Sequence, residues 1–559
     1  MVILVAAAFL SLGLLNFDFG QAWWRGQVRR LGIGLPIVLV YAYLEMPALV
    51  FPQALTLLLL TLIPNAVYSM LLAARTAIVA RRIVSIRRPP LAPYLLAPVA
   101  LALFAGILAI APVVDASGLR DIVDVSTSNT LPPSANLAHI RVVPEESAIF
   151  AGNKVVGQLG AYYQVGQFNV QVERGHLVWV APLEFQGLVQ WLSRRTSPGV
   201  IVVSAENPDA PAELRQRSPM RFIPSAPVND NLYRHVYMTY GFEQILETTL
   251  QLDDKGDPQY LATLGRPTIG WSGQKVTGVV IVDPATGAMQ RYARADFDKL
   301  PHWVSRVYPD QLALEYNEWF GKYVHGMWNY LFAKRDVHVP ARPEVFGLLA
   351  DRFVWFVDHT SPASDQSMTG FTYMDTVTGK TTYYTSSGGE FNSRGAEDAV
   401  ASNPIVRQGK LVPTQPILYN AFQQNTWVVP LVAPDTGKYQ TLALVQAKNG
   451  RVVVGSTSSG SPQNDAFAQY AAVLGVSASV DESGGLERRF EGQIERIAAG
   501  PGDSIYFTLH GSRQIFGIDG ATAPALLARS GDRVTFRAAP ARGGSISKVR
   551  DFQDAALAP

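Results

Sequence analysis

The stretch TGVVIVDPATGAMQRY, residues 277–292, recurs as TGFTYMDTVTGKTTYY at residues 369–384. The two copies share the pattern T-G-x4-D-x2-T-G-x4-Y, in which D-x-x-T-G separates two runs rich in β-branched and aromatic residues. Asp can accept hydrogen bonds from the backbone ahead of it and Gly supplies a positive φ, so this segment is typical of a hairpin turn. The repeat therefore predicts one antiparallel β-hairpin in two copies.

Helix-like segments follow these hairpins, namely DFDKLPHWVSRVY, GAEDAVASN and PQNDAFAQYAAVLG. The third of them follows a weaker copy of the hairpin, LALVQAKNGRVVVGS, and RGHLVWVAPLEF is a candidate earlier relative. The chain is thus predicted to contain repeated antiparallel hairpin-plus-helix modules of α+β class. Such units resemble PepSY-like modules, small α+β domains on the outer side of bacterial membranes. The resemblance implies a non-catalytic role in binding or inhibiting peptidases, or in covering the outer side of membrane proteins.

Residues 309–334, PDQLALEYNEWFGKYVHGMWNYLFAK, are the aromatic centre of the chain. Apolar side chains recur there at spacings of three and four residues, at Leu312, Tyr316, Trp319, Phe320, Tyr323, Met327 and Leu331. This spacing predicts an amphipathic helix over about 310–333 whose aromatic face is buried. The alternative is a docking helix for a partner. His325 has no second ligand four residues away, so it does not indicate a metal site.

Residues 487–552 contain short apolar runs separated by Gly and Asp turns. This pattern predicts a small closed β-barrel, which resembles an OB-type barrel. Such barrels often bind oligonucleotides or sugars, but acidic residues nearly balance the arginines here. A structural or protein-binding barrel is therefore expected.

Four apolar runs occupy the first 114 residues, at about 2–17, 31–50, 54–80 and 91–114. A helix needs ~20 apolar residues to cross a bilayer, so these runs predict four transmembrane helices, the first of which could instead be a signal-peptide core. The basic residues of this block fall in two groups, Arg25, Arg29 and Arg30, and then Arg75, Arg81, Arg82, Arg87 and Arg88. If both groups are cytoplasmic, both termini lie outside.

The expected organisation follows from these segments. It is a membrane domain at 1–114, a linker at 115–137, a first α+β module at 138–230, a PepSY-like module with the long aromatic helix at 231–345, repeated α+β (PepSY-like) modules at 346–480, and the OB-like barrel at 487–552. The expected localisation is the cell membrane, multi-pass, with the large C-terminal region extracytoplasmic.

Composition excludes several functions. The chain has no cysteine, which rules out disulfides, thiol nucleophiles and cysteine metal ligands. Its 47 Lys and Arg against 45 Asp and Glu give no electrostatic case for nucleic acid as a partner. Neither G-x-S-x-G, H-E-x-x-H, G-x-G-x-x-G nor G-x4-G-K-[ST] is present. The sequence therefore assigns no catalytic, cofactor-binding or metal-ligating residue, and it predicts no cofactor.

Two functions remain open. The first is a non-catalytic, membrane-anchored scaffold that presents β-rich modules to an envelope or membrane assembly. The second is an exported peptidase regulator or hydrolase that uses a cleft between the modules, and a polar pocket with converging acids or a Ser/His pair would favour it. The expected partners are the lipid bilayer and proteins outside the cytoplasmic membrane, self-assembly included. The balance of motifs leans against an enzyme.

Overall fold

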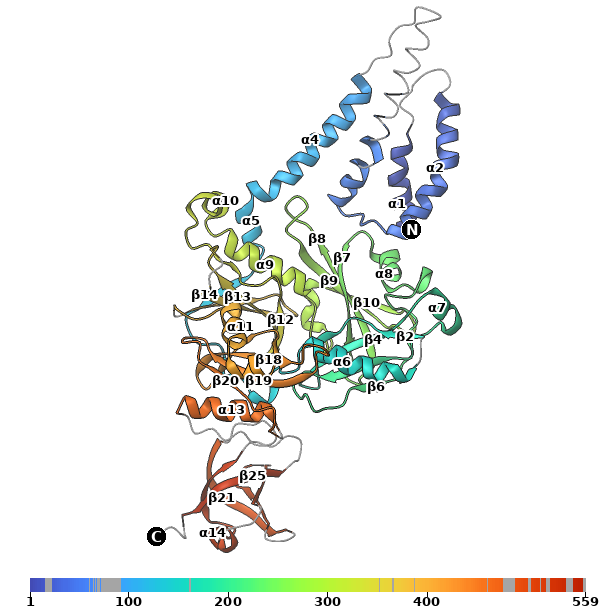
Figure 1. Ribbon diagram of the computed structural model, residues 1–559. Coiled ribbons are helices and arrows are strands. Elements are labelled where there is room, and N and C mark those ends of the chain that lie inside the picture. Colours follow the sequence, from blue (N-terminus) through green and yellow to red (C-terminus); the bar gives the residue numbers. More distant parts are fainter. Residues whose placement is uncertain are drawn as a thin grey trace, which may run out of the picture.

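The computed structural model describes residues 1–15, 23–59, 61–63, 65, 67, 71, 92–159, 162–350, 352–363, 366–386, 388–459, 461–475, 488–500, 504–512, 514–518, 523–538 and 546–555. Within these residues the chain forms four open sheets and one closed barrel. The open sheets lie between a group of N-terminal helices and the C-terminal barrel, which are at opposite ends of the molecule (Figure 1).

The first two sheets come from residues 163–293. The first has the order β2-β4-β5-β6 with β3 also paired to β4, and comprises β2 (Tyr163–Val165), β3 (Asn169–Glu173), β4 (His176–Phe185), β5 (Val200–Ser204) and β6 (Glu213–Arg215). Helices α6 (Glu145–Val156) and α7 (Leu188–Arg194) accompany it. The second has the order β10-β9-β8-β7 and comprises β7 (Gln244–Leu252), β8 (Pro258–Arg266), β9 (Lys275–Val282) and β10 (Met289–Ala293). Helix α8 (Leu232–Tyr240) precedes it and the 3-10 helix η5 (Arg294–Lys299) follows it.

The third and fourth sheets continue the chain. The third has the order β1-β15-β14-β13-β11 with β12 on β13, and comprises β1 (Val125–Ser128), β11 (Val339–Pro340), β12 (Phe346–Leu349), β13 (Phe353–Thr360), β14 (Met368–Asp375) and β15 (Thr381–Thr385). The fourth has the order β16-β18-β19-β20 with β17 on β18, and comprises β16 (Val412–Pro413), β17 (Ile417–Ala421), β18 (Gln424–Val432), β19 (Tyr439–Gln446) and β20 (Val452–Val454). Their helices are α11 (Ser393–Ala401), α12 (Pro404–Gln408) and α13 (Pro462–Val473).

The C-terminal region forms a small closed barrel, as the sequence predicts. Its strands follow the order β21-β22-β23-β25-β24, with β21 (Arg488–Ala499), β22 (Ile505–Leu509), β23 (Ile515–Ile518), β24 (Arg533–Ala538) and β25 (Ile546–Asp554). Helix α14 (Ala523–Leu527) lies between β23 and β24. Aromatic rings fill the interior, where Phe516 lies 4.8 Å from Phe536 and 5.6 Å from Phe507 between centroids. A core separate from those of the open sheets therefore stabilises the barrel.

The two copies of the T-G repeat form the same hairpin, which confirms the prediction. Gly278 pairs with Ala293 in β9–β10, and the equivalent Gly370 pairs with Thr385 in β14–β15. The two turns have the same hydrogen bond, from Gly287 N to Asp283 O at 2.8 Å and from Gly379 N to Asp375 O at 2.9 Å. Both turn glycines have positive φ, 78° and 75°. The helix that follows is 3-10 after the first copy and α-helical after the second.

The fourth sheet contains the weaker copy and one more turn of the same kind. In the predicted third copy, Gly450 N donates to Gln446 O at 2.9 Å and Gly450 has a φ of 67°. The β18–β19 turn repeats this bond between Gly437 N and Ala433 O, with a φ of 68° at Gly437. The D-x-x-T-G pattern does not predict this turn, because Asp435 is displaced relative to that pattern.

The first two sheets are buried on both faces. Along β4, Leu177, Trp179 and Ala181 belong to one core and Val178 and Val180 belong to another. The same alternation occurs in β5 and β9, where successive residues also enter the two cores in turn. Side chains alternate across a strand, so a strand covered on both faces reads as a continuous apolar run. The larger core extends into the third and fourth sheets and joins all four.

The aromatic helix is shorter than predicted. Helix α9 covers Asp310–Lys322, and the chain then passes through His325 and Gly326, with φ of 60° and 82°, into the short helices α10 (Gly326–Trp328) and η6 (Asn329–Ala333). The predicted face is buried at Leu312, Tyr316, Trp319, Phe320 and Tyr323. It is exposed at Leu331, so the prediction is confirmed for α9 and wrong beyond the break.

The described N-terminal helices do not support a membrane domain. Helix α1 (Val2–Ser11) is only 10 residues long, and α2 (Trp23–Glu45) includes Arg25, Arg29 and Arg30 near its start. The fourth apolar run forms α4 (Ala92–Val114), whereas most of the third run and the second group of arginines lie outside the described residues. Within the part of the chain that is described, none of the helices combines the length and apolar character that a membrane span requires.

The prediction of four transmembrane helices is therefore wrong for the described residues, and so is the multi-pass localisation in the cell membrane that was deduced from it. Helices α1 and α2 instead pack on each other and on α8. Tyr43 lies at this contact, where its ring is 4.5 Å from the Arg234 guanidinium and its carbonyl accepts from Arg234 Nε at 3.2 Å. Residues 115–137, the expected linker, contribute α5 (Ala116–Arg120) and β1, which pairs parallel with β15.

Gly379→Ala is expected to destabilise the protein. Its φ of 75° costs a residue with a Cβ roughly 1–2 kcal/mol, and that Cβ would lie 2.5 Å from the Tyr308 ring. Gly157→Ala is the control, because Gly157 has a φ of −51° and open space at its Cβ position. Urea unfolding should show a loss of more than about 1 kcal/mol for Gly379→Ala and little change for Gly157→Ala. Equal stability of the two variants would contradict the role of this turn.

Trp319→Ala is expected to lower the free energy of unfolding by ~3–5 kcal/mol, as truncation of a large core aromatic does. Trp319 is 9% exposed and its ring centroid lies 5.6 Å from that of Tyr316. Glu318→Ala, one residue away on the exposed side of α9, should be nearly silent. An unchanged melting temperature for Trp319→Ala would restore the docking-helix alternative.

Candidate functional site

The segment 302–308, HWVSRVY, lies where the first three sheets meet. Its backbone accepts hydrogen bonds from the second sheet, through Gln251 Nε2 to Arg306 O at 2.5 Å and Thr263 Oγ1 to Val307 O at 2.6 Å. It accepts from the β14–β15 turn through Thr376 Oγ1 to Ser305 O at 2.5 Å. We call 302–308 the junction segment.

Arg306 anchors the junction segment in the protein interior. Its side chain is 4% exposed, and its Nη2 lies 2.7 Å and 2.9 Å from the two carboxylate oxygens of Glu247 on β7. The guanidinium also lies 4.8 Å from the Trp355 ring centroid on β13 and donates to Asn169 Oδ1 at 3.3 Å. One side chain thus contacts three sheets. Burial raises the pKa of the Glu247 carboxyl, and the charge of Arg306 opposes that rise.

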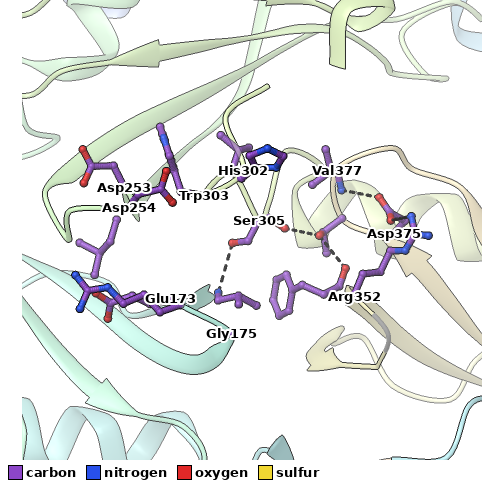
Figure 2. A pocket seen from close by; sticks show the side chains of 16 residues that line it. Glu173, Gly175, Asp253, Asp254, His302, Trp303, Ser305, Arg352, Asp375 and Val377 are labelled. Carbon is purple, nitrogen blue, oxygen red and sulfur yellow. Dashed lines mark hydrogen bonds and ion pairs between the residues drawn. The ribbon is translucent and has the colours of Figure 1, made fainter. Parts of the chain in front are cut away.

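A cavity of about 400 Å³ lies beside the junction segment, and we call it the junction pocket (Figure 2). Its walls are the β3–β4 turn, the β7–β8 turn, residues 302–305, and two segments at one end of the β13–β14 pair, namely 352–353 and 375–377. The charged and polar residues that line it are Glu173, Arg174, Asp253, Asp254, His302, Ser305, Arg352, Asp375 and Thr376. Three separate sheets therefore contribute polar groups to one site.

Two of the four lining acids are paired with arginines. Glu173 accepts from Arg215 Nη1 at 2.6 Å, and Asp375 accepts from Arg352 Nη1 at 2.7 Å. Asp253 is held by its own turn, where its Oδ1 accepts from the backbone N of Lys255 and Asp257, each at 2.9 Å. The side chain of Asp254 is exposed at the mouth of the pocket. The four lining acids stand against Arg174, Arg352 and the Arg215 that pairs with Glu173, so a net excess of one negative charge favours a cationic ligand.

Ser305 and His302 also line the pocket, but they do not form a nucleophile–base pair in this arrangement. The Ser305 hydroxyl lies 3.3 Å from Gln251 Oε1, to which it donates, and accepts from Val172 N at 3.4 Å. A serine nucleophile needs a base within hydrogen-bond reach of its hydroxyl. The hydroxyl of Ser305 is instead used to join the first and second sheets.

The sequence assigned no site residue, and the structure explains why this pocket was missed. Its lining comes from five segments between 172 and 377, each an ordinary polar turn by itself. Asp253–Asp254 is an adjacent acidic pair, but adjacent acids in a turn are by default solvated surface. A pocket where three sheets meet depends on how those sheets pack, and the sequence does not show that packing. The sequence shows only that the chain contains many polar turns.

A second polar cluster lies buried under α9. His338 Nδ1 and His359 Nδ1 are 2.8 Å apart, and His359 Nε2 lies 2.9 Å from Asn317 Oδ1. Asn317 Nδ2 donates to Ala313 O, which identifies its Oδ1 as the acceptor. His359 Nε2 therefore carries a proton and its Nδ1 accepts from His338 Nδ1–H. Both imidazoles are neutral in this chain of hydrogen bonds.

Burial explains why the pair stays neutral. Burial and the nearby charge of Arg120 lower the pKa of His338 to about 4. Burial also lowers the pKa of His359 well below its ordinary value, and His338 adds to that effect. The cluster lies between α9 and the third sheet, and none of its residues lines the junction pocket.

The histidine pair predicts acid sensitivity. In the unfolded chain an imidazole titrates near ~6.5, so between about pH 6.5 and 4 the unfolded state binds more protons than the folded state. The free energy of unfolding should therefore fall as the pH is lowered through this window, by ~3 kcal/mol for a shift from 6.5 to about 4 at His338. Urea unfolding at pH 7, 5.5 and 4.5 should show a shallower dependence for His338→Gln than for the parent chain. The exposed His325→Gln is the control, and parallel pH curves for His338→Gln and the parent would contradict the assignment.

Comparisons with known proteins assign no family to the chain. No family model matches it, and no curated protein is similar to it. Its function therefore has to be inferred from its own residues.

Proposed function

We propose that the chain is a non-catalytic binding protein whose junction pocket holds a cationic group of a protein partner. The observation that carries the proposal is the lining of the pocket, in which turns from three sheets bring together four acids and two arginines. Glu173 is paired with Arg215 and Asp375 with Arg352, which leaves Asp253 and Asp254 against Arg174, an excess of one negative charge. A Lys or Arg side chain of a partner has the complementary charge and a reach suited to a cavity of about 400 Å³.

The protein nature of the partner is supported by the repeat. The hairpin-plus-helix units resemble PepSY-like modules, and the resemblance implies binding of peptidases or other proteins. A peptidase regulator is one form that such a scaffold would take. The expectation of a bilayer as partner depended on the transmembrane prediction and forms no part of this proposal.

The barrel is a second candidate binding module within the same scaffold. Its strand order β21-β22-β23-β25-β24, with β23 and β25 parallel and α14 between β23 and β24, favours the resemblance to OB-type barrels. Arginines and acids pair on its surface, as Arg533 does with Glu491 at 3.0 Å. This mixed charge favours a protein over an oligonucleotide.

A hydrolase is the other candidate, because Ser305 and His302 share the pocket. The hydrogen bonds of Ser305 oppose it. An activated serine would be labelled by a fluorophosphonate probe, and we expect no labelling at Ser305. Labelling that is lost in Ser305→Ala would replace the binding proposal with a hydrolase.

The cationic-ligand proposal is tested with the His302→Cys variant. Because the chain has no other cysteine, an environment-sensitive fluorophore can be attached at this position alone. A tri-arginine peptide should shift the emission, and a tri-glutamate peptide should not. Asp254→Asn should weaken binding of tri-arginine about two- to fivefold, the size expected for one exposed charge pair. Asp435→Asn, an exposed acid of the β18–β19 turn, is the matched control. Equal responses to both peptides, or equal effects of the two substitutions, would contradict the proposal.

A further inference from the structure

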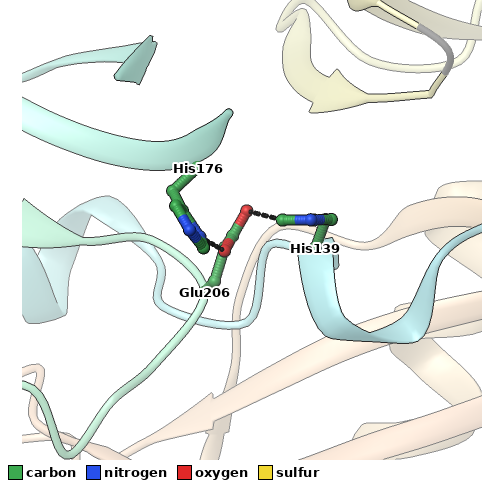
Figure 3. Close-up of side chains that lie close together, drawn as sticks. All are labelled: His139, His176 and Glu206. Atoms are coloured by element: carbon green, nitrogen blue, oxygen red, sulfur yellow. Dashed lines mark hydrogen bonds and ion pairs between the residues drawn. The ribbon is translucent and has the colours of Figure 1, made fainter. Parts of the chain in front are cut away.

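Two histidines and a glutamate from separate segments meet where β4 begins and β5 ends in the first sheet (Figure 3). His139 ends the 3-10 helix η2 (Leu137–His139), His176 begins β4, and Glu206 follows β5. Their potential ligand atoms all lie within 4.8 Å of one another. Residues 30 to 67 positions apart in the sequence thus form one compact group.

Each carboxylate oxygen of Glu206 faces a different imidazole. Oε1 lies 2.8 Å from His139 Nδ1, and Oε2 lies 2.9 Å from His176 Nδ1. The backbone N of Leu177 also donates to Oε1 at 2.9 Å, which fixes the orientation of the carboxylate. The two imidazoles therefore converge on one acid through the same ring nitrogen.

The backbone holds these three side chains in place. The loop that carries Glu206 is pinned by Ala205, whose N donates to Leu177 O and whose O accepts from Val142 N and Val143 N, each at 3.0 Å. His139 N donates to Asn136 O at 2.8 Å. A site built on such restrained segments needs little reorganisation to bind a ligand.

The charge of Glu206 calls for a cation. The residue is 8% exposed, and within the described part of the chain no lysine or arginine forms an ion pair with it. A carboxylate at this degree of burial is normally paired with a positive charge or bound to a metal. The two imidazoles that contact it supply hydrogen bonds.

We propose that His139, His176 and Glu206 bind a divalent transition-metal ion of the Zn²⁺ class. Zn²⁺ binds His nitrogen at ~2.0–2.1 Å and carboxylate oxygen at ~2.0–2.2 Å, and two His with one Glu is an established ligand set for it. Metal binding through Nδ1 requires the other tautomer of each imidazole, in which the proton that Nδ1 donates to Glu206 is carried by Nε2 and the Nδ1 lone pair faces the metal. Modest rotations of the three side chains bring the ligand atoms to one centre.

The geometry also leaves room for a further ligand. The His176 side chain is 52% exposed, so the group opens to solvent on that side. Three protein ligands fill only part of a tetrahedral shell, and the remaining position goes to water or to a donor from a bound molecule. Tyr419 of β17 accepts a hydrogen bond from the backbone N of Arg141 at 3.2 Å, two residues after His139. The site therefore lies where the first sheet faces the fourth.

The proposal is tested by titrating the purified full chain with ZnCl₂ and, separately, with CoCl₂. We expect one Zn²⁺ per chain, a rise in melting temperature with Zn²⁺, and a Co²⁺ absorption spectrum typical of nitrogen and oxygen ligands. His176→Ala, at a half-exposed position, should weaken Zn²⁺ binding by more than about tenfold. His325→Ala is the matched control, because His325 forms an exposed pair with Asp336 at 3.1 Å and should leave binding unchanged.

Glu206→Gln provides a second variant. The amide has the size of the carboxylate and can still form hydrogen bonds, but it lacks the negative charge that would bind the metal. It too should lose tight Zn²⁺ binding while its far-ultraviolet circular dichroism stays that of the parent. If one of the two variants fails to fold, the other tests the proposal, and its Co²⁺ absorption spectrum should differ from that of the parent. Absence of Zn²⁺ binding to the parent chain at 100-fold excess, or equal binding by the parent and His176→Ala, would overturn the proposal and leave a structural hydrogen-bond network.

Discussion

The buried ion pair between Arg306 and Glu247 is the interaction on which the arrangement of the first three sheets depends. Arg306 lies on the junction segment, Glu247 on β7, and the guanidinium also covers Trp355 of β13. Arg306 is 4% exposed and Glu247 is 25% exposed. A buried charge is tolerated only when it is paired, so removal of Glu247 would leave the Arg306 guanidinium uncompensated in the interior. Because one side chain joins elements of several sheets, the sheets hold one another in position. The junction pocket exists only where this packing is intact.

Burial of both faces constrains the register in which the strands pair. Strands β4, β5 and β9 send alternate side chains into two cores, so a slip of one residue in register would exchange the two sets. The turn glycines with positive φ fix the register from one end of each hairpin. Repeated turns and shared cores therefore act together, and the modules behave as parts of a single packed unit. The barrel, with its own core of phenylalanines, is the exception.

Features that depend on neighbouring residues could be predicted from the sequence, whereas contacts between distant segments could not. The D-x-x-T-G turn could be predicted because its hydrogen bonds lie within five residues, as from Ala285 N to Asp283 Oδ1 at 2.8 Å. The helical spacing of apolar residues predicts α9. It does not reveal that the helix ends before His325 and Gly326, whose φ values are positive. Composition predicts membrane spans for the apolar runs of the first 114 residues, but Tyr43 of α2 instead contacts Arg234 of α8, 191 residues away. Both candidate sites depend on such distant contacts.

The two candidate sites share one short stretch of backbone. Arg174 and Gly175 line the junction pocket, and the next residue, His176, is a proposed metal ligand. The turn is tight, with φ of 51° at Arg174 and 83° at Gly175, so the positions on either side of it cannot move independently. A metal that restrains His176 would also restrain the wall of the pocket, and linkage requires any such effect to be reciprocal. Occupancy of one site would then change the ligand affinity of the other through residues 174–176, without movement of the sheets themselves.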